Sequence, residues 1–147
     1  MNSTLGTAGV VLGLAASLFG VGTLAYGLRG HRDLLPFARI YAWMILGGAV
    51  LAVFAMERAL ITRDFTVEYV SQVGSHDTPA LFNVAAMWSS LEGSILLWVL
   101  VLAGFTALVA WRFRARADDP LVAWAQLTMF AVCVFFFGLL LGPANPF

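Results

Sequence analysis

The sequence predicts an all-α, polytopic membrane protein with four transmembrane helices and a longer outer loop between helices two and three. Two properties of the composition favour this fold over a soluble one. The 147 residues are 61% hydrophobic and 11% charged, whereas a soluble domain is about 45–50% apolar and about 25% charged. A soluble domain of this size has too much surface for its volume to bury so many apolar side chains. The third observation is the concentration of the apolar residues in four long runs, with most charges between them.

Each of the four runs has the length of a membrane span. A helix of about 17–25 apolar residues crosses the hydrocarbon core of a bilayer, and backbone groups in lipid must bond within their own segment. The first run is preceded by no basic residues and is longer than the apolar part of a signal peptide, so we interpret it as a retained helix. We expect one membrane domain, residues 1–147, with helices over about 5–28, 38–58, 91–111 and 121–141.

The arginines predict how the helices are oriented. Six of the eight lie in the two short connections, between helices one and two and between helices three and four. Because basic loops face the cytoplasm, we expect both connections on the inner side of the cell inner (cytoplasmic) membrane. Both termini and the longer loop then face outward. The six arginines are Arg29, Arg32, Arg39, Arg112, Arg114 and Arg116.

The same composition excludes several kinds of chemistry. The chain has no lysine and a single cysteine, Cys133, so a lysine nucleophile, an internal disulfide and a CxxC pair are all excluded. The two histidines, His31 and His76, are far apart in the sequence, and we expect no metal site. The net charge is zero, so the chain has no basic surface for nucleic acid, and the lipid bilayer is its expected environment.

Glycines recur along the first helix at every seventh position, forming a stripe of small side chains. Such a stripe allows a second helix to approach closely in lipid, where packing drives association. We favour an internal packing seam, and a dimerisation face is the alternative. The stripe consists of Gly6, Gly13, Gly20 and Gly27.

Glu92 stands at the mouth of the third helix, between Trp88 and Trp98. An ionisable residue at this position in an apolar segment is costly and indicates a functional site. The simpler interpretation is a helix cap, because the helix dipole stabilises an acid in the first turn. Both interpretations stay open at this point.

Two motifs then identify a family resemblance. Residues 64–70 read DFTVEYV, and residues 88–98 read WSSLEGSILLW. They resemble the N-terminal region of the cytochrome c maturation protein CcmF, which carries "DFSV-x-YV" in its first outer loop and "W-x-x-x-EGS-x-LLW" at its third helix. The closing Asn145-Pro146-Phe147 is similar to the "NPF" that follows the fourth helix of that family.

The resemblance implies a role in haem chemistry. CcmF belongs with CcsA and CcmC to a group of membrane proteins that handle haem. It receives haem from the chaperone CcmE and works with CcmH to attach the haem to thiols of apocytochrome c. The chain would then be the N-terminal module of a haem lyase, with haem held by the complete complex, and its partners would be the remaining part of the lyase, a CcmE-like chaperone, a CcmH-like thiol partner and apocytochrome c.

The resemblance also proposes site residues. Trp88, Glu92 and Trp98 are the candidates for facing the cofactor. The remaining motif residues are candidates for contacts with a partner. They are Asp64, Phe65, Tyr69, Gly93 and Ser94.

The chain departs from the family pattern in two ways. Leu91 occupies the position before Glu92, where the family usually has histidine. The family's haem-ligand histidines and its tryptophan-rich segment lie further along than this chain extends. We therefore assign no catalytic residue and expect no thioether formation by this chain alone, because axial ligands are needed to hold haem iron. The alternatives are a structural or an ion-coupled transport subunit of another membrane complex. A transport subunit predicts a second intramembrane ionisable residue, which the four apolar runs lack.

Overall fold

A computed structural model describes residues 2–62, 70 and 91–147. Across these residues the chain forms four long helices and two short 3-10 helices, and no strand. All four long helices have the length and apolar composition needed to cross a membrane, so the prediction of an all-α, multi-pass membrane protein is confirmed. The elements are α1 (Asn2–Leu28), η1 (Arg32–Phe37), α2 (Ala38–Ile61), α5 (Leu91–Arg112), η2 (Arg114–Arg116) and α6 (Pro120–Leu141).

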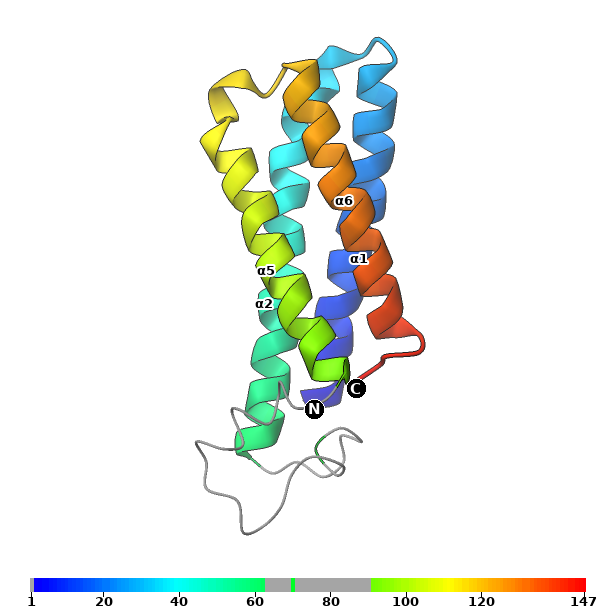
Figure 1. The fold of residues 1–147 in the computed structure, drawn as a ribbon, viewed down its shortest axis with the longest axis vertical. Helices are drawn as coiled ribbons and strands as arrows, with labels where there is room; N and C mark the ends of the chain where they lie inside the picture. The colour runs from blue at the N-terminus through cyan, green and yellow to red at the C-terminus, as the bar shows by residue number, and fades with distance from the viewer. Residues whose placement is uncertain (1, 63–69, 71–90) are drawn as a thin grey trace.

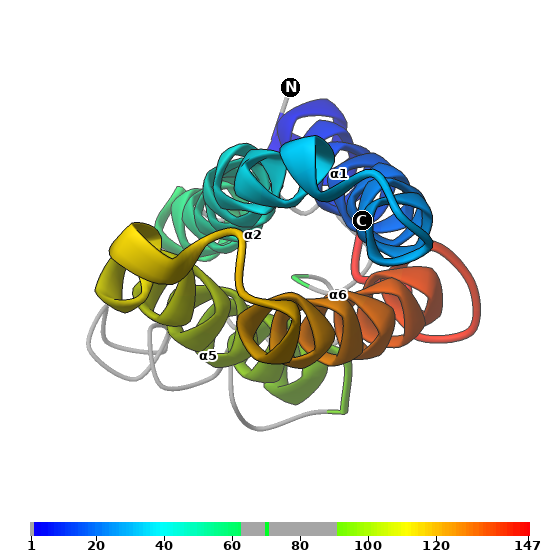
Figure 2. The ribbon, with the colours of Figure 1, turned by 90° about the horizontal axis from the view of Figure 1, so that it is seen from above.

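The four helices stand side by side as an antiparallel bundle (Figure 1). Seen from above, they form a ring in the order α1, α2, α5, α6, and each helix packs mainly against its two neighbours in the ring (Figure 2). The two short connections, with η1 and η2, lie at one end of the bundle, which we call the arginine-rich end. Both termini and the first turn of α5 lie at the other, which we call the motif end.

Local sequence sets the boundaries at the arginine-rich end. Just beyond the end of α1, Gly30 has a φ of +132°, a conformation that glycine adopts without the steric cost of a Cβ atom. At the start of α6, the Asp119 carboxylate accepts a hydrogen bond of 2.9 Å from the Leu121 N–H. Pro120 follows directly in the first position of the helix, where a missing N–H costs nothing.

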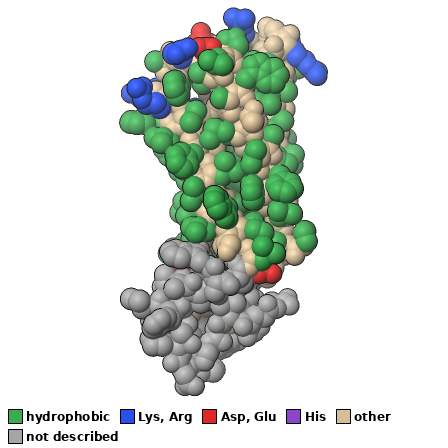
Figure 3. All heavy atoms as spheres, in the orientation of Figure 1, with side chains coloured by type: hydrophobic (Ala, Val, Ile, Leu, Met, Phe, Trp, Pro, Cys, Tyr) green, Lys and Arg blue, Asp and Glu red, His purple; other side chains and the backbone are tan. Residues whose placement is uncertain are grey.

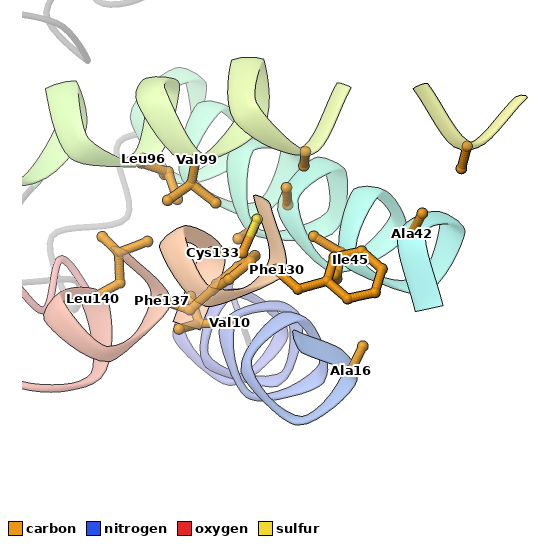
Figure 4. Packing of buried hydrophobic residues seen from close by; sticks show 14 of the residues in the cluster. Val10, Ala16, Ala42, Ile45, Leu96, Val99, Phe130, Cys133, Phe137 and Leu140 are labelled. Carbon is orange, nitrogen blue, oxygen red and sulfur yellow. The ribbon is translucent and has the colours of Figure 1, made fainter. Parts of the chain in front are cut away.

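Aromatic side chains of α6 fill the centre of the bundle. Phe130, Cys133 and Phe137 are fully buried and point from α6 towards the other helices (Figure 4). They meet small or branched side chains, such as Val10 of α1 and Ile45 of α2. Large rings on one helix thus complement small residues on its neighbours, and this complementarity is what packs helices closely in a bilayer.

The glycine stripe of α1 lies inside the bundle. All four of its glycines are buried, and each faces a side chain of the same chain. A Cβ atom added at Gly20 would lie 2.6 Å from the Phe130 ring, and one added at Gly27 would lie 2.8 Å from Leu35. The rings of Phe147 and Phe137 lie against Gly6 and Gly13 in the same way. The stripe therefore packs against aromatic rings of α6 and of the C-terminal segment at its first three glycines, and against Leu35 at its last.

A second line of small residues brings α1 and α2 together. A Cβ atom added at Gly9 would lie 2.7 Å from the Gly48 carbonyl oxygen, and one added at Gly48 would lie 2.6 Å from the Gly9 carbonyl oxygen. The two backbones are thus in direct contact at this crossing. Glycine is required on both sides, because only a residue without a side chain permits this approach.

On the face seen in Figure 3, the surface of the helices is largely apolar between the two ends of the bundle. Large side chains such as Phe19, Trp98 and Leu121 have 69%, 64% and 72% of their surface exposed. Surface of this kind would be unstable in water over so large an area. This exposed apolar surface is explained by contact with lipid or with further membrane helices.

Candidate functional site

The motif end contains the described part of the second motif. Glu92, Gly93 and Ser94 lie in the first turn of α5. Gly93 is buried, whereas Glu92 and Ser94 are half-buried. An acidic side chain in this turn is stabilised by the positive end of the helix dipole. The position of Glu92 in this turn is thus compatible with a helix cap, and the residue is partly exposed.

Trp98 lies on a different side of α5 from Glu92. At roughly 100° per residue, six residues along an α-helix place the two side chains about 120° apart. The indole is 64% exposed and shares an outward stripe with Leu91 and Phe105, which are 69% and 58% exposed. This outward stripe of Leu91, Trp98 and Phe105 points away from the four-helix bundle. The described residues therefore do not bring Glu92 and Trp98 to one surface.

The C-terminal segment lies at the motif end, beside the start of α1. The Ser3 hydroxyl donates a hydrogen bond of 2.9 Å to the Phe147 carbonyl oxygen. The Phe147 N–H donates a bond of 2.9 Å to the Asn145 side-chain oxygen, while Pro146 is buried. With the Phe147 ring on Gly6, the closing Asn-Pro-Phe joins the two ends of the described chain.

Glu57 is a further acidic residue at the motif end, and it was not among the predicted site residues. It lies within α2, which continues to Ile61, and its Oε2 atom is buried without a hydrogen-bond partner among the described residues. Beyond it, the Thr62 hydroxyl closes the helix by donating a bond of 2.7 Å to the Arg58 carbonyl oxygen. A signal was present in the sequence, because Glu57 and Glu92 are acids that flank apolar runs at the same end of the bundle.

Four of the predicted site residues lie outside the described residues. Asp64, Phe65 and Tyr69 of the first motif belong to this group, together with Trp88 of the second. Their roles remain predictions that rest on the motifs alone.

Among the described residues, no histidine or cysteine lies at the motif end. No group of three or more His, Cys, Asp or Glu side chains that could hold a metal occurs across the described ranges. His31 lies at the arginine-rich end and stacks on Tyr26, with ring centroids 4.2 Å apart. Cys133 is fully buried in the core. Since haem iron is held by side chains such as these, this part of the chain does not fit the role of holding the iron.

The chain was compared with known proteins by sequence and by structure. No family model matches it. It is 35% identical to the cytochrome c-type biogenesis protein CcmF of Escherichia coli over 119 residues, which are 81% of this chain and 18% of that protein. CcmF of Haemophilus influenzae is 28% identical over 148 residues, covering 100% of this chain and 23% of that protein.

The structural comparison covers the whole chain. The solved structure of the cytochrome c haem lyase CcmF superposes with a TM-score of 0.92 and 34% sequence identity, over 100% of this chain and 25% of the solved one. By sequence and fold, this chain is related to the N-terminal region of CcmF. The predicted resemblance to CcmF is thereby confirmed. The chain spans about a fifth of the length of the curated CcmF relatives, 18% and 23% in these two cases.

Proposed function

We propose that this chain is the N-terminal module of a cytochrome c haem lyase and supports haem delivery to apocytochrome c and its covalent attachment there. The observation that carries the proposal is the similarity of the entire chain to the structure of the haem lyase CcmF, at a TM-score of 0.92. When bound in the complete complex, haem supplies the vinyl groups that react with the thiols of apocytochrome c. The residues of this chain act as a scaffold in this proposal, because no histidine or cysteine of the described part lies at the motif end.

The working side is the motif end, facing outward from the inner membrane. The distribution of the arginines supports this orientation, because six of the eight lie at the opposite end of the bundle and basic loops remain in the cytoplasm. Both termini then lie outside together with Glu92. A CcmE-like chaperone, a CcmH-like thiol partner and apocytochrome c would be met on this side.

Glu92 and Trp98 lie on two different surfaces of the module. Glu92 is half-buried at the start of α5 and is placed to bind a group on the outer face, such as an arginine of another subunit. Trp98 is exposed along α5 with Leu91 and Phe105, and this outward stripe is proposed to pack against the remaining helices of the lyase. A flat indole also suits the plane of a porphyrin.

The test is the yield of holocytochrome c in cells that assemble the whole complex. We expect Glu92→Gln, which keeps the shape of the side chain and removes its charge, to lower the amount of covalent haem detected on a c-type cytochrome. Asp33→Asn is the matched control, because Asp33 is an exposed carboxylate at the arginine-rich end. Assembly of each variant is checked by affinity purification with the CcmE- and CcmH-like partners.

The outcomes separate the proposed function from its alternatives. A normal haem yield of Glu92→Gln with normal assembly would show that Glu92 acts only as a helix cap. Failure to recover any partner of the haem-attachment machinery, with unchanged cytochromes after deletion of the chain, would favour a structural or transport subunit of another complex.

A further inference from the structure

A cavity of about 320 Å³ opens at the arginine-rich end, far from the motif end. It lies where the start of α2, the end of α5 and the start of α6 meet. Apolar side chains such as Leu35 and Val122 form part of its wall, and four polar side chains complete it. The proposed function makes no use of this cavity. The four polar residues are Arg39, Arg114, Asp118 and Gln126.

Gln126 is the buried polar group of this cavity. The side chain is 1% exposed, and its Nε2 atom donates a hydrogen bond of 3.3 Å to the Thr106 carbonyl oxygen. Its Oε1 atom is buried without a hydrogen-bond partner among the described residues. Buried polar atoms are almost always hydrogen-bonded in stable proteins. Gln126 lines the cavity, so its unsatisfied acceptor lies beside the cavity, where a rotation of the side-chain amide would bring it within reach of a hydrogen-bond donor of a ligand.

Two guanidinium groups give the cavity a positive rim. Arg39 comes from α2 and Arg114 from η2, and both are exposed. The Arg114 guanidinium lies over the Trp111 ring at 5.2 Å and donates a bond of 3.0 Å to the Trp111 carbonyl oxygen, which restrains its position. In contrast, Arg116 is paired with Asp119. Guanidinium groups bind phosphate oxygens through directed, charge-assisted hydrogen bonds.

The place of the cavity favours a lipid over a soluble ligand. The cavity lies at the arginine-rich end, where the apolar surface seen in Figure 3 gives way to charged side chains, at the level where phospholipid headgroups meet a membrane helix. Ile40 and Leu121, each next in sequence to this region, are 54% and 72% exposed and offer apolar surface for acyl chains. The six arginines at this end outnumber its three aspartates, so an anionic lipid is attracted more strongly than a zwitterionic one.

We propose that this cavity binds the headgroup of an anionic phospholipid whose headgroup carries hydroxyls, as in phosphatidylglycerol. The phosphate lies between Arg39 and Arg114, and a headgroup hydroxyl donates to the Oε1 atom of Gln126. Asp118 accepts a second hydroxyl at the rim. The site is formed by three helices, so bound lipid would also hold the arginine-rich ends of α2, α5 and α6 together.

The experiment measures lipid binding to the full chain in detergent. Short-chain phosphatidylglycerol is titrated and the bound fraction is read by native mass spectrometry. We expect the double variant Arg39→Gln/Arg114→Gln to bind about thirtyfold more weakly, since each directed guanidinium–phosphate hydrogen bond contributes roughly a fivefold change in affinity. The matched control is Arg29→Gln/Arg32→Gln, which removes the same charge from the same end but outside the cavity. The helical content of both variants is compared by circular dichroism.

A second variant tests the role assigned to Gln126. Phosphatidylethanol has the same phosphodiester charge but no headgroup hydroxyl, so the wild type should prefer phosphatidylglycerol over it. Gln126→Met, a substitution of similar volume, should reduce this preference while binding phosphatidylethanol as before.

Three results would overturn the proposal. An equal loss in both double variants would show attraction to surface charge without a site. Unchanged binding in Arg39→Gln/Arg114→Gln, or no retained phosphatidylglycerol on the wild type, would mean that the cavity receives something else, such as another protein segment. An unchanged lipid preference in Gln126→Met would remove the assigned hydroxyl contact.

Discussion

Helices α1 and α5 lie on opposite sides of the ring and use glycine in opposite ways. In α1, Gly9 lies against the backbone of α2 and Gly20 lies against the Phe130 ring of α6. In α5, an added Cβ atom at Gly104 would meet nothing within 4 Å. The buried face of α5 combines Leu96 and Val99 with alanines such as Ala103. Glycine therefore determines helix packing at Gly9 and Gly20 of α1 and is not needed for it at Gly104 of α5.

The difference indicates which parts of the chain tolerate change. The glycine contacts of α1 leave no space for a side chain, so substitutions there must displace a neighbouring helix or ring. The outward stripe of α5, with Trp98 and Phe105, makes no comparable contact within the four-helix bundle. Stability is thus expected to depend on α1, and association with further helices on α5.

The largest effect is expected at the crossing of α1 and α2. Gly48→Ala would place a Cβ atom 2.6 Å from the Gly9 carbonyl oxygen, and a backbone atom cannot rotate away. We expect the free energy of unfolding to fall by about 2–3 kcal/mol, at the upper part of the range for overpacked cores. Reversible unfolding in mixed detergent micelles, followed by circular dichroism, measures the change.

Gly104→Ala and Gly47→Ala are the matched controls, because neither added Cβ atom would meet another atom within 4 Å. Alanine has the higher helix propensity, so these variants should be as stable as the wild type or up to about 1 kcal/mol more stable. Equal destabilisation of the variants at Gly48 and Gly104 would contradict the contrast between the two helices.

A smaller loss is expected where the neighbour is a side chain. Gly20→Ala would place a Cβ atom 2.6 Å from the Phe130 ring, which can move at some cost, so we expect a loss of about 1–2 kcal/mol. Phe130→Leu removes part of the ring and should recover stability when combined with Gly20→Ala. A double-mutant cycle measures this coupling, and strictly additive losses would show that the two residues do not meet.

Removal of the exposed indole should hardly change the stability of the bundle. Trp98 is 64% exposed, and substitutions at such positions usually alter the free energy of unfolding by within about 0.5 kcal/mol. We expect Trp98→Ala to unfold like the wild type in the same micelle assay, while its recovery with the remaining part of the lyase decreases. Destabilisation comparable to that of Gly20→Ala would place Trp98 in the core of the bundle.

The smallest effect concerns the start of α6. A hydrogen bond from the Leu121 N–H, together with one from Arg116, holds the pKa of Asp119 below its ordinary value of 3.8. A carboxylate with a lowered pKa stabilises the folded state above its ordinary pKa, and this contribution is lost as the pH falls through the lowered value. Asp119→Asn should therefore reduce stability slightly at neutral pH, and the difference from the wild type should shrink below pH 3.8. A constant difference across the pH range would argue against an ionised cap.

The apolar runs were sufficient to predict the four helices, because their length and the charges beside them reflect the thickness of the bilayer. The ends were less predictable. Helix α2 was predicted over 38–58 and continues to Ile61, since a long side chain near a membrane surface does not terminate a helix. The repeat of Gly13 and Gly20 predicted a stripe but not its partner, because the seven-residue spacing of Phe130 and Phe137 becomes relevant only once α6 lies against α1.

The arrangement of the candidate site residues was harder to predict from the sequence. The motif placed Glu92 and Trp98 close in sequence, but helical geometry separates them around α5. The contact between Ser3 and Phe147 joins residues from opposite ends of the chain, and no local pattern indicates such a contact. The cavity beside Gln126 likewise forms only where three helices meet.

The central claim is that this chain is needed for covalent haem attachment. The most direct measurement is the covalent haem on c-type cytochromes after the gene for this chain is deleted, with apocytochrome levels followed by antibody. If this chain is a module of the haem lyase, covalent haem is lost while apocytochrome persists or is degraded, and the intact chain restores it. Unchanged covalent haem in the deletion strain would contradict the proposed function.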